Sequence, residues 1–183
     1  MVAIIIVLVV LVLVVGFVIS AYNGLVKLRN KVKTNWSQID VVLKRRTDLI
    51  PNLVETVKGY ASHEKDTLEA TISARNKYLS AGNMNEQMEA SGELTSALNR
   101  IMMLGEAYPQ LKADTSFNNL QNSIKETEDK IQYARQFYND SVYGYNNKRE
   151  TFPSSIIASM FNFQEFSLFT IADTEKEVPK VEF

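Results

Sequence analysis

The first 26 residues constrain the fold most strongly, because they contain no Asp, Glu, Lys or Arg. As a helix, this segment would be roughly 39 Å long, and the hydrocarbon core of a bilayer is about 30 Å thick. All 20 basic and 21 acidic side chains therefore fall in the remainder of the 183-residue chain. The formal charge of −1 thus averages an apolar segment and a charged body of ordinary soluble composition.

We expect this segment to be a retained transmembrane helix rather than a cleaved signal peptide. A signal peptide has a positively charged start, a shorter apolar core and a small-residue cleavage site, whereas no Lys or Arg precedes this apolar run. Basic residues follow it instead, beginning at Lys27. The positive-inside rule then predicts a single-pass protein of the cell membrane, with its N-terminus outside and the bulk of the chain in the cytoplasm.

The basic residues that follow the span form what we call the basic collar. Near an anionic bilayer surface each such residue contributes about 1 kcal/mol of attraction. For the last three members, an ordinary solvated helix face is an equally good interpretation. The collar comprises Lys27, Arg29, Lys31, Lys33, Lys44, Arg45 and Arg46.

The rest of the chain carries apolar residues at helical spacing in four stretches. The last of these, over residues 117–145, alternates steps of three and four residues, which is typical of a bundle or coiled-coil seam. Pro51 predicts a helix boundary or kink near 48–51, and Ala81-Gly82-Asn83 predicts a turn. The predicted fold class is all-α, with an N-terminal transmembrane helix (1–26) continuing into a long antiparallel four-helix bundle (27–152).

Two further segments follow the predicted bundle. Residues 153–172 are apolar and rich in Phe, and they are expected to pack on the bundle, on the membrane or on a neighbouring subunit. Residues 173–183 are expected to form an acidic tail, in which a proline prevents a helix. The candidate interaction surface consists of Phe161, Phe163, Phe166 and Phe169.

No motif indicates catalysis or metal binding. The chain has no cysteine, and its single histidine, His63, begins a zinc-like His-Glu pair whose second histidine position is occupied by Thr67. A serine hydrolase built around His63 is an alternative without a supporting motif. We therefore expect no catalytic residues, no metal and no cofactor, and the balanced charge argues against nucleic-acid binding.

Tyrosines and asparagines concentrate in residues 138–147, near the end of the fourth helical stretch. Buried Tyr and Asn can fix the register of long helices, since each needs a hydrogen-bond partner. This structural role is the favoured interpretation, and a recognition surface is the alternative.

Short strings along almost the whole chain carry a family resemblance, most densely between Trp36 and Glu64. The strings occupy residues 36–46, 48–61, 63–64, 106–113, 120–121, 127–128, 134–135, 138–140, 145–146, 152–153 and 179–183. In these strings the chain resembles the LemA family. The resemblance implies a bacterial or archaeal membrane protein with one span, a cytoplasmic body of long antiparallel helices and no assigned catalytic residues. It also implies a loose link to a membrane zinc protease and to magnetosome membranes.

The functional prediction is a non-enzymatic, membrane-anchored helical scaffold that self-associates or organises partners at the cytoplasmic membrane face. Its expected partners are the lipid bilayer and further copies of the chain, with a membrane protease as another candidate. The alternatives are a membrane-remodelling or lipid-binding protein, and an adaptor for a membrane protease.

Overall fold

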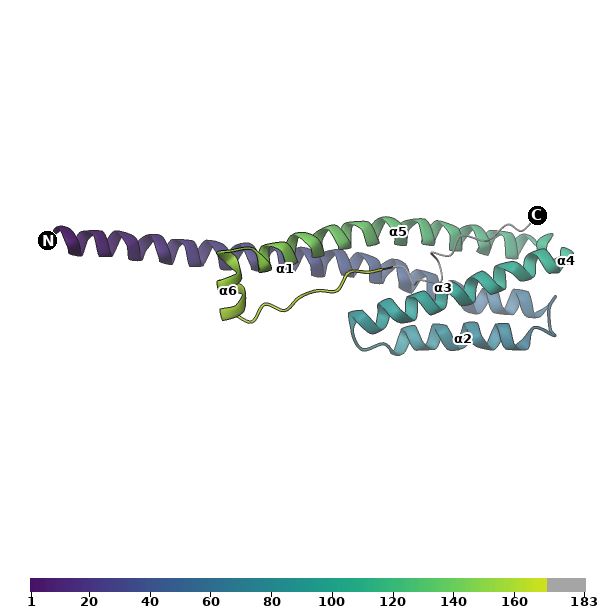
Figure 1. Ribbon diagram of the computed structural model, residues 1–183. Helices are drawn as coiled ribbons and strands as arrows, with labels where there is room; N and C mark the ends of the chain where they lie inside the picture. Colours follow the sequence, from purple (N-terminus) through teal and green to yellow (C-terminus); the bar gives the residue numbers. More distant parts are fainter. Residues whose placement is uncertain (171–183) are drawn as a thin grey trace, which may run out of the picture. The chain divides into compact units, whose positions relative to one another are not determined.

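The computed structural model describes residues 1–170, which form helices and connecting segments without a strand (Figure 1). The predicted all-α class is therefore confirmed. The predicted acidic tail and the last two residues of the Phe-rich segment lie outside the described residues. The helices are α1 (Val2–Lys58), α2 (Lys65–Ser80), α3 (Met84–Ala107), α4 (Pro109–Lys112), α5 (Thr115–Glu150) and α6 (Ser154–Met160).

The chain divides into two compact units. Unit 1 contains Met1–Gln38 and Ala134–Leu168, and the described part of unit 2 contains residues 39–133 and 169–170. The predicted bundle over 27–152 is thus divided between two units, and a single four-helix bundle stays a prediction.

Helix α1 is unbroken for 57 residues, from the charge-free segment to Lys58, so the helix boundary predicted near 48–51 is wrong, and the kink given as its alternative stays a prediction. Proline lacks an N–H and leaves the carbonyl four residues earlier without its helical donor. For Pro51 this is the carbonyl of Thr47, which instead accepts a hydrogen bond from Arg75 Nε on α2 at 2.9 Å. A side chain from a neighbouring helix thus replaces the bond that Pro51 removes.

In unit 1, α1 and α5 are antiparallel. Asn35 Nδ2 donates to the carbonyl of Phe137 at 3.0 Å, and the rings of Trp36 and Tyr138 are 5.4 Å apart. The buried apolar side chains include Leu25, Val32 and Trp36 from α1 and Tyr138, Val142 and Tyr145 from α5.

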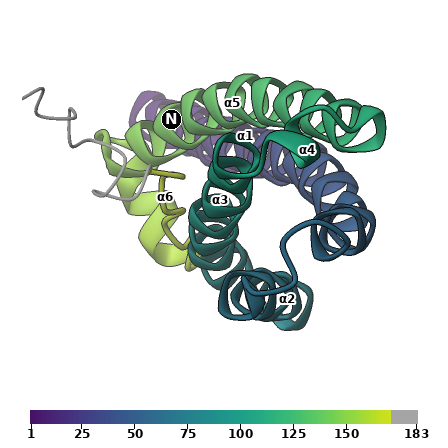
Figure 2. The ribbon, with the colours of Figure 1, turned by 90° about the vertical axis from the view of Figure 1, so that its right-hand side faces the viewer.

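In unit 2, α2 and α3 form a helical hairpin whose turn lies where the sequence predicts it (Figure 2). Asn83 caps α3 by accepting the backbone N–H of Glu86 at 3.0 Å, and the Glu86 carboxylate accepts from Gly82 N at 2.7 Å. These two bonds satisfy backbone donors at the start of α3. The apolar core of unit 2 includes Ile50, Leu53, Val57, Leu94, Ile101, Phe117 and Ile124.

Candidate functional site

The N-terminal part of α1 presents an exposed apolar surface. Its most apolar stretch reaches a mean hydropathy of 3.7, and none of that stretch is buried by the rest of the described chain. By length and composition this helix can cross a membrane. An exposed all-apolar helix surface is what a lipid-facing segment presents.

The basic collar is divided between the two units. Lys27, Lys31 and Lys33 are exposed in unit 1, whereas Arg29 is half-buried and lies over the ring of Phe163, with 5.2 Å from its guanidinium carbon to the ring centroid. The remaining members belong to unit 2, where Lys44 and Arg45 are exposed.

The prediction that Arg46 belongs to the basic collar is corrected, because its side chain is fully buried. Its Nη1 donates to Thr95 Oγ1 at 2.8 Å and forms an ion pair with Glu128. Its Nη2 donates to the carbonyl and hydroxyl oxygens of Ser91, at 3.1 and 3.0 Å. These bonds connect α1 to α3 and α5, so Arg46 organises the interior of unit 2 and is not part of a membrane-facing surface.

A second polar contact joins α1 and α2 beside this network. Tyr78 is buried, and its hydroxyl donates to Asp40 Oδ1 at 3.0 Å. Burial, followed by the bond to Asp40, raises the pKa of Tyr78, so this phenol stays protonated at neutral pH. Sequence reasoning did not identify this pair; Asp40, the one acid within the basic run 27–46, was the available signal.

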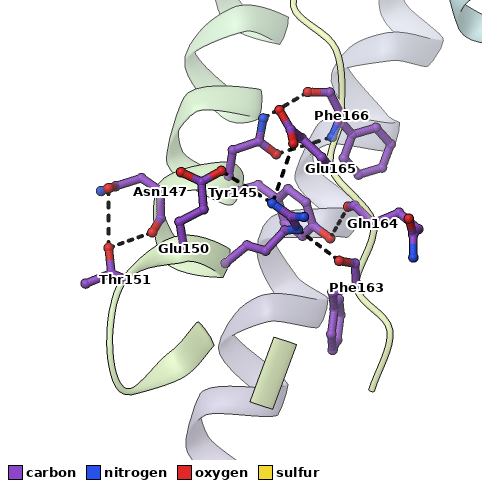
Figure 3. Close-up of polar contacts among 10 residues, drawn as sticks. Tyr145, Asn147, Glu150, Thr151, Phe163, Gln164, Glu165 and Phe166 are labelled. Carbon is purple, nitrogen blue, oxygen red and sulfur yellow. Dashed lines mark hydrogen bonds and ion pairs between the residues drawn. The ribbon is translucent and has the colours of Figure 1, made fainter. Parts of the chain in front are cut away.

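The Tyr and Asn cluster of α5 holds the backbone of an extended segment, residues 163–168, which we call the docked segment (Figure 3). Asn146 is bonded to both backbone groups of Phe166: its Nδ2 donates to the carbonyl at 2.9 Å, and its Oδ1 accepts from the N–H at 3.2 Å. The Tyr145 hydroxyl donates to the carbonyl of Gln164 at 2.7 Å, and Arg149 Nε donates to that of Phe163 at 3.0 Å.

Tyr138 completes this set of contacts, since its hydroxyl donates to the carbonyl of Ser167 at 2.9 Å. Burial raises the pKa of Tyr138 to about 12, which keeps the phenol a hydrogen-bond donor. The favoured structural interpretation of these tyrosines and asparagines therefore agrees with the contacts, although the partner is a backbone segment rather than a facing helix. These polar contacts use the backbone carbonyl and amide groups of the segment, while its side chains Phe163 and Phe166 pack against Arg29 and Tyr145.

The four Phe residues of the candidate interaction surface have different surroundings. Phe161 is exposed and contacts Tyr22, with ring centroids 4.8 Å apart, and Phe166 is partly buried against Tyr145 at 5.2 Å. Phe163 and Phe169 are buried, in unit 1 and unit 2 respectively, so these two side chains are not exposed members of the candidate interaction surface. The exposed apolar side chains of this region are Phe152, Ile156, Met160, Phe161 and Leu168.

His63 is exposed in the connection between α1 and α2, and the neighbouring Glu64 accepts a hydrogen bond from the Tyr108 hydroxyl at 3.0 Å. Within residues 1–170, no group of three or more His, Asp or Glu side chains is arranged to hold a metal ion.

Comparison with protein families tests the resemblance directly. A model of the LemA family matches residues 35–183, which is most of the chain. The chain belongs to the LemA family. The match covers the residues after the apolar segment, so it concerns the helical body.

Curated relatives include proteins with two different names. Protein LemA of Metamycoplasma hominis is 23% identical over 155 residues, which cover 84% of this chain and 71% of that relative. Magnetosome protein MamQ 2 of Paramagnetospirillum magneticum is 24% identical over 174 residues, covering 81% of this chain and 64% of the relative. MamQ of Magnetospirillum gryphiswaldense is 23% identical with the same coverage. The chain thus spans less than two thirds of the length of these MamQ relatives.

Proposed function

We propose that this LemA-family protein is a single-pass, membrane-anchored helical scaffold that self-associates and organises partners at the cytoplasmic membrane face. The observation that carries the proposal is the continuity of α1, which joins an exposed apolar segment to a packed helical body without a break. Within unit 1, the residues of α1 that pack on α5 follow the charge-free segment without a flexible linker, which supports a direct attachment of this unit to its anchor.

The proposed orientation rests on the exposed members of the collar. Lys27, Lys31 and Lys33 follow the charge-free segment directly, and their ammonium groups are free to face water or anionic head groups. Positive charge close to a span favours the cytoplasmic side. The N-terminus is accordingly outside the cell membrane and the helical body inside.

The proposal of self-association is supported by exposed aromatic side chains on α5. Phe137 and Tyr143 project from unit 1, with 61% and 71% of their surfaces exposed. Aromatic residues are enriched in the cores of protein interfaces, where they bury a large area at small entropic cost. A second copy of this chain is the partner we propose for them.

The test is the mass of the particle extracted from membranes, measured by light scattering in detergent and again in nanodiscs over a range of concentrations. We expect an oligomer that the double variant Phe137→Ser/Tyr143→Ser shifts toward monomer, whereas Met103→Ser, at an exposed apolar position of α3, leaves the mass unchanged. A wild-type protein that is monomeric at every concentration in both environments contradicts self-association.

A lipid-binding function is the second candidate, and the exposed lysines of the collar favour it. Anionic lipid attracts each exposed lysine by about 1 kcal/mol, and salt weakens this attraction within a Debye length of about 8–10 Å. Binding of the detergent-free protein to vesicles should therefore rise with phosphatidylglycerol content and fall with salt. Binding that depends neither on phosphatidylglycerol content nor on salt concentration contradicts an electrostatic role for the collar.

A further inference from the structure

The region after α5 carries an exposed apolar stripe at helical spacing. Phe152, Ile156 and Met160 follow one another at intervals of four residues and are 77%, 53% and 67% exposed. Phe152 precedes α6, whereas Ile156 and Met160 lie within it. Residues spaced by four share one helix face, so Ile156 and Met160 form a single surface. We call the three exposed side chains together the apolar stripe.

The opposite face of α6 is fixed within unit 1. Ser154, Ile157 and Ala158 are buried, and Ser154 Oγ donates to the carbonyl of Lys148 at 2.6 Å. After α6, the N–H of Phe163 donates to the carbonyl of Ala158 at 2.9 Å, where the docked segment begins. The helix is therefore held on one side, and the apolar stripe faces outward.

The position of α6 along α1 follows from two independent observations. The ring of Phe161 lies 4.8 Å from that of Tyr22, which belongs to the charge-free segment. In addition, α1 and α5 are antiparallel with Trp36 beside Tyr138, so the end of α5 is level with about residue 24 of α1, counting one residue for one. Both place α6 beside the last turns of the charge-free segment (Figure 1).

We propose that α6 lies in the interfacial region of the same bilayer that α1 spans, with Phe152, Ile156 and Met160 inserted among the lipids. This inference rests on the proposed membrane anchoring. An exposed apolar face beside a lipid-facing helix segment is continuous with the surface that already contacts the acyl chains, and interfacial helices insert such faces by about 5–10 Å.

The polar surroundings of the stripe favour a lipid surface as its partner. Lys148 is exposed in the last turn of α5, and Lys27 is exposed where the charge-free segment of α1 ends. Lysine beside an apolar face is the pattern of interfacial helices that bind anionic membranes. Tyr22, with an apolar ring and a polar hydroxyl, suits the same depth.

The absence of cysteine from the sequence allows a test with single labels in the full-length chain. The variants Ile156→Cys and Met160→Cys carry the environment-sensitive dye NBD and are reconstituted into vesicles of phosphatidylcholine and phosphatidylglycerol. Quenching is measured with a lipid that carries a spin label near the carbonyl end of its acyl chain. Val10→Cys reports on the anchor, and circular dichroism verifies the helix content of each variant.

Gln136→Cys is the control. Gln136 is an exposed residue of the same unit, outside the proposed self-association surface, and the helical rise places it about 21 Å along α5 from Glu150, away from the apolar segment. Any general affinity of the dye for lipid would appear at this position as well.

We expect the spin-labelled lipid to reduce emission from the probes at 156, 160 and 10 but not from the probe at 136. Quenching of the probe at 10 without quenching of the probes at 156 and 160 overturns the interfacial position of α6 and is still consistent with the proposed membrane anchor. Absence of quenching at 10 contradicts the anchor itself. Energy transfer between probes at 156 on different copies, together with insensitivity to the quencher, also overturns the inference, because the stripe then contacts another protein copy.

Discussion

The Arg46–Glu128 ion pair of unit 2 leads to a prediction in which substitution of the more exposed partner lowers the free energy of unfolding more. Arg46 is fully buried, whereas 36% of the Glu128 side chain is exposed. If burial alone set the cost of a substitution, removal of Arg46 would be the more damaging change. We predict the opposite order for Glu128→Ala and Arg46→Met.

The magnitudes follow from what each substitution leaves behind. Glu128→Ala leaves a buried guanidinium without a counter-ion, and breaking a fully buried pair costs about 3–5 kcal/mol. The Ser91 and Thr95 oxygens still accept from Arg46, and water reaches this site through the exposed part of the pair, so we expect about 2–3 kcal/mol.

Arg46→Met removes the buried charge together with its bonds and keeps an unbranched side chain. The Glu128 carboxylate can then be solvated because it is already partly exposed. The carbonyl of Ser91 keeps the hydrogen bond that it accepts from Thr95 Oγ1 at 3.1 Å. Few buried groups lose all their partners, and we expect a loss of about 1 kcal/mol.

The assay is denaturant unfolding of the full chain in a mild non-ionic detergent, followed by circular dichroism at constant protein concentration. The double variant Arg46→Met/Glu128→Ala completes a mutant cycle, and its loss should be smaller than the sum of the two single losses. A larger loss for Arg46→Met than for Glu128→Ala, or additive losses, would refute this reasoning about the buried charge.

Three further predictions concern other contacts. Gly105→Ala should lower the free energy of unfolding even though alanine favours helices, because the new Cβ would lie 2.8 Å from the buried ring of Phe117. Gly144→Ala, where the new Cβ enters open space, should raise the free energy of unfolding by up to about 1 kcal/mol. Asp114 accepts the N–H of Phe117, which holds the pKa of this carboxyl below its ordinary value of 3.8. The ionised Asp114 contributes to the stability of the fold fully above pH 3.8, and this contribution is lost as the pH falls through the lower pKa of the folded state. The thermal midpoint of Asp114→Asn should therefore fall less on acidification than that of the wild type. Asn146→Ala should speed amide hydrogen exchange in the docked segment, and unchanged exchange there would contradict the role assigned to this side chain.

Helix positions were predictable wherever a local signal determines them. The turn between α2 and α3 lies at the predicted residues, since Asn83 and Gly82 act within their own turn. Pro51 misled the prediction because its effect depends on a residue of another helix. The donor that satisfies the Thr47 carbonyl comes from Arg75, and no local pattern connects positions so far apart in the sequence.

The basic collar illustrates a second limit of sequence reasoning. Arg45 and Arg46 are adjacent and chemically identical, yet the first is exposed and the second is fully buried. On a helix, neighbouring residues point about 100° apart, so only the positions of the partner helices decide which one enters the core. The acceptors are provided by Ser91, Thr95 and Glu128.

The docked segment and the apolar stripe are connected through α5. The side chains of α5 hold the docked segment by its backbone groups, and Ser154 bonds back to the end of α5. The position of α6 is thus set by contacts that do not involve the exposed face of α6. Substituting the apolar stripe with serine should therefore weaken the proposed interaction with lipid while leaving the fold of unit 1 intact. An exposed apolar face that the fold does not need is typical of an interaction surface, and the bilayer that α1 is proposed to span is the partner that fits it.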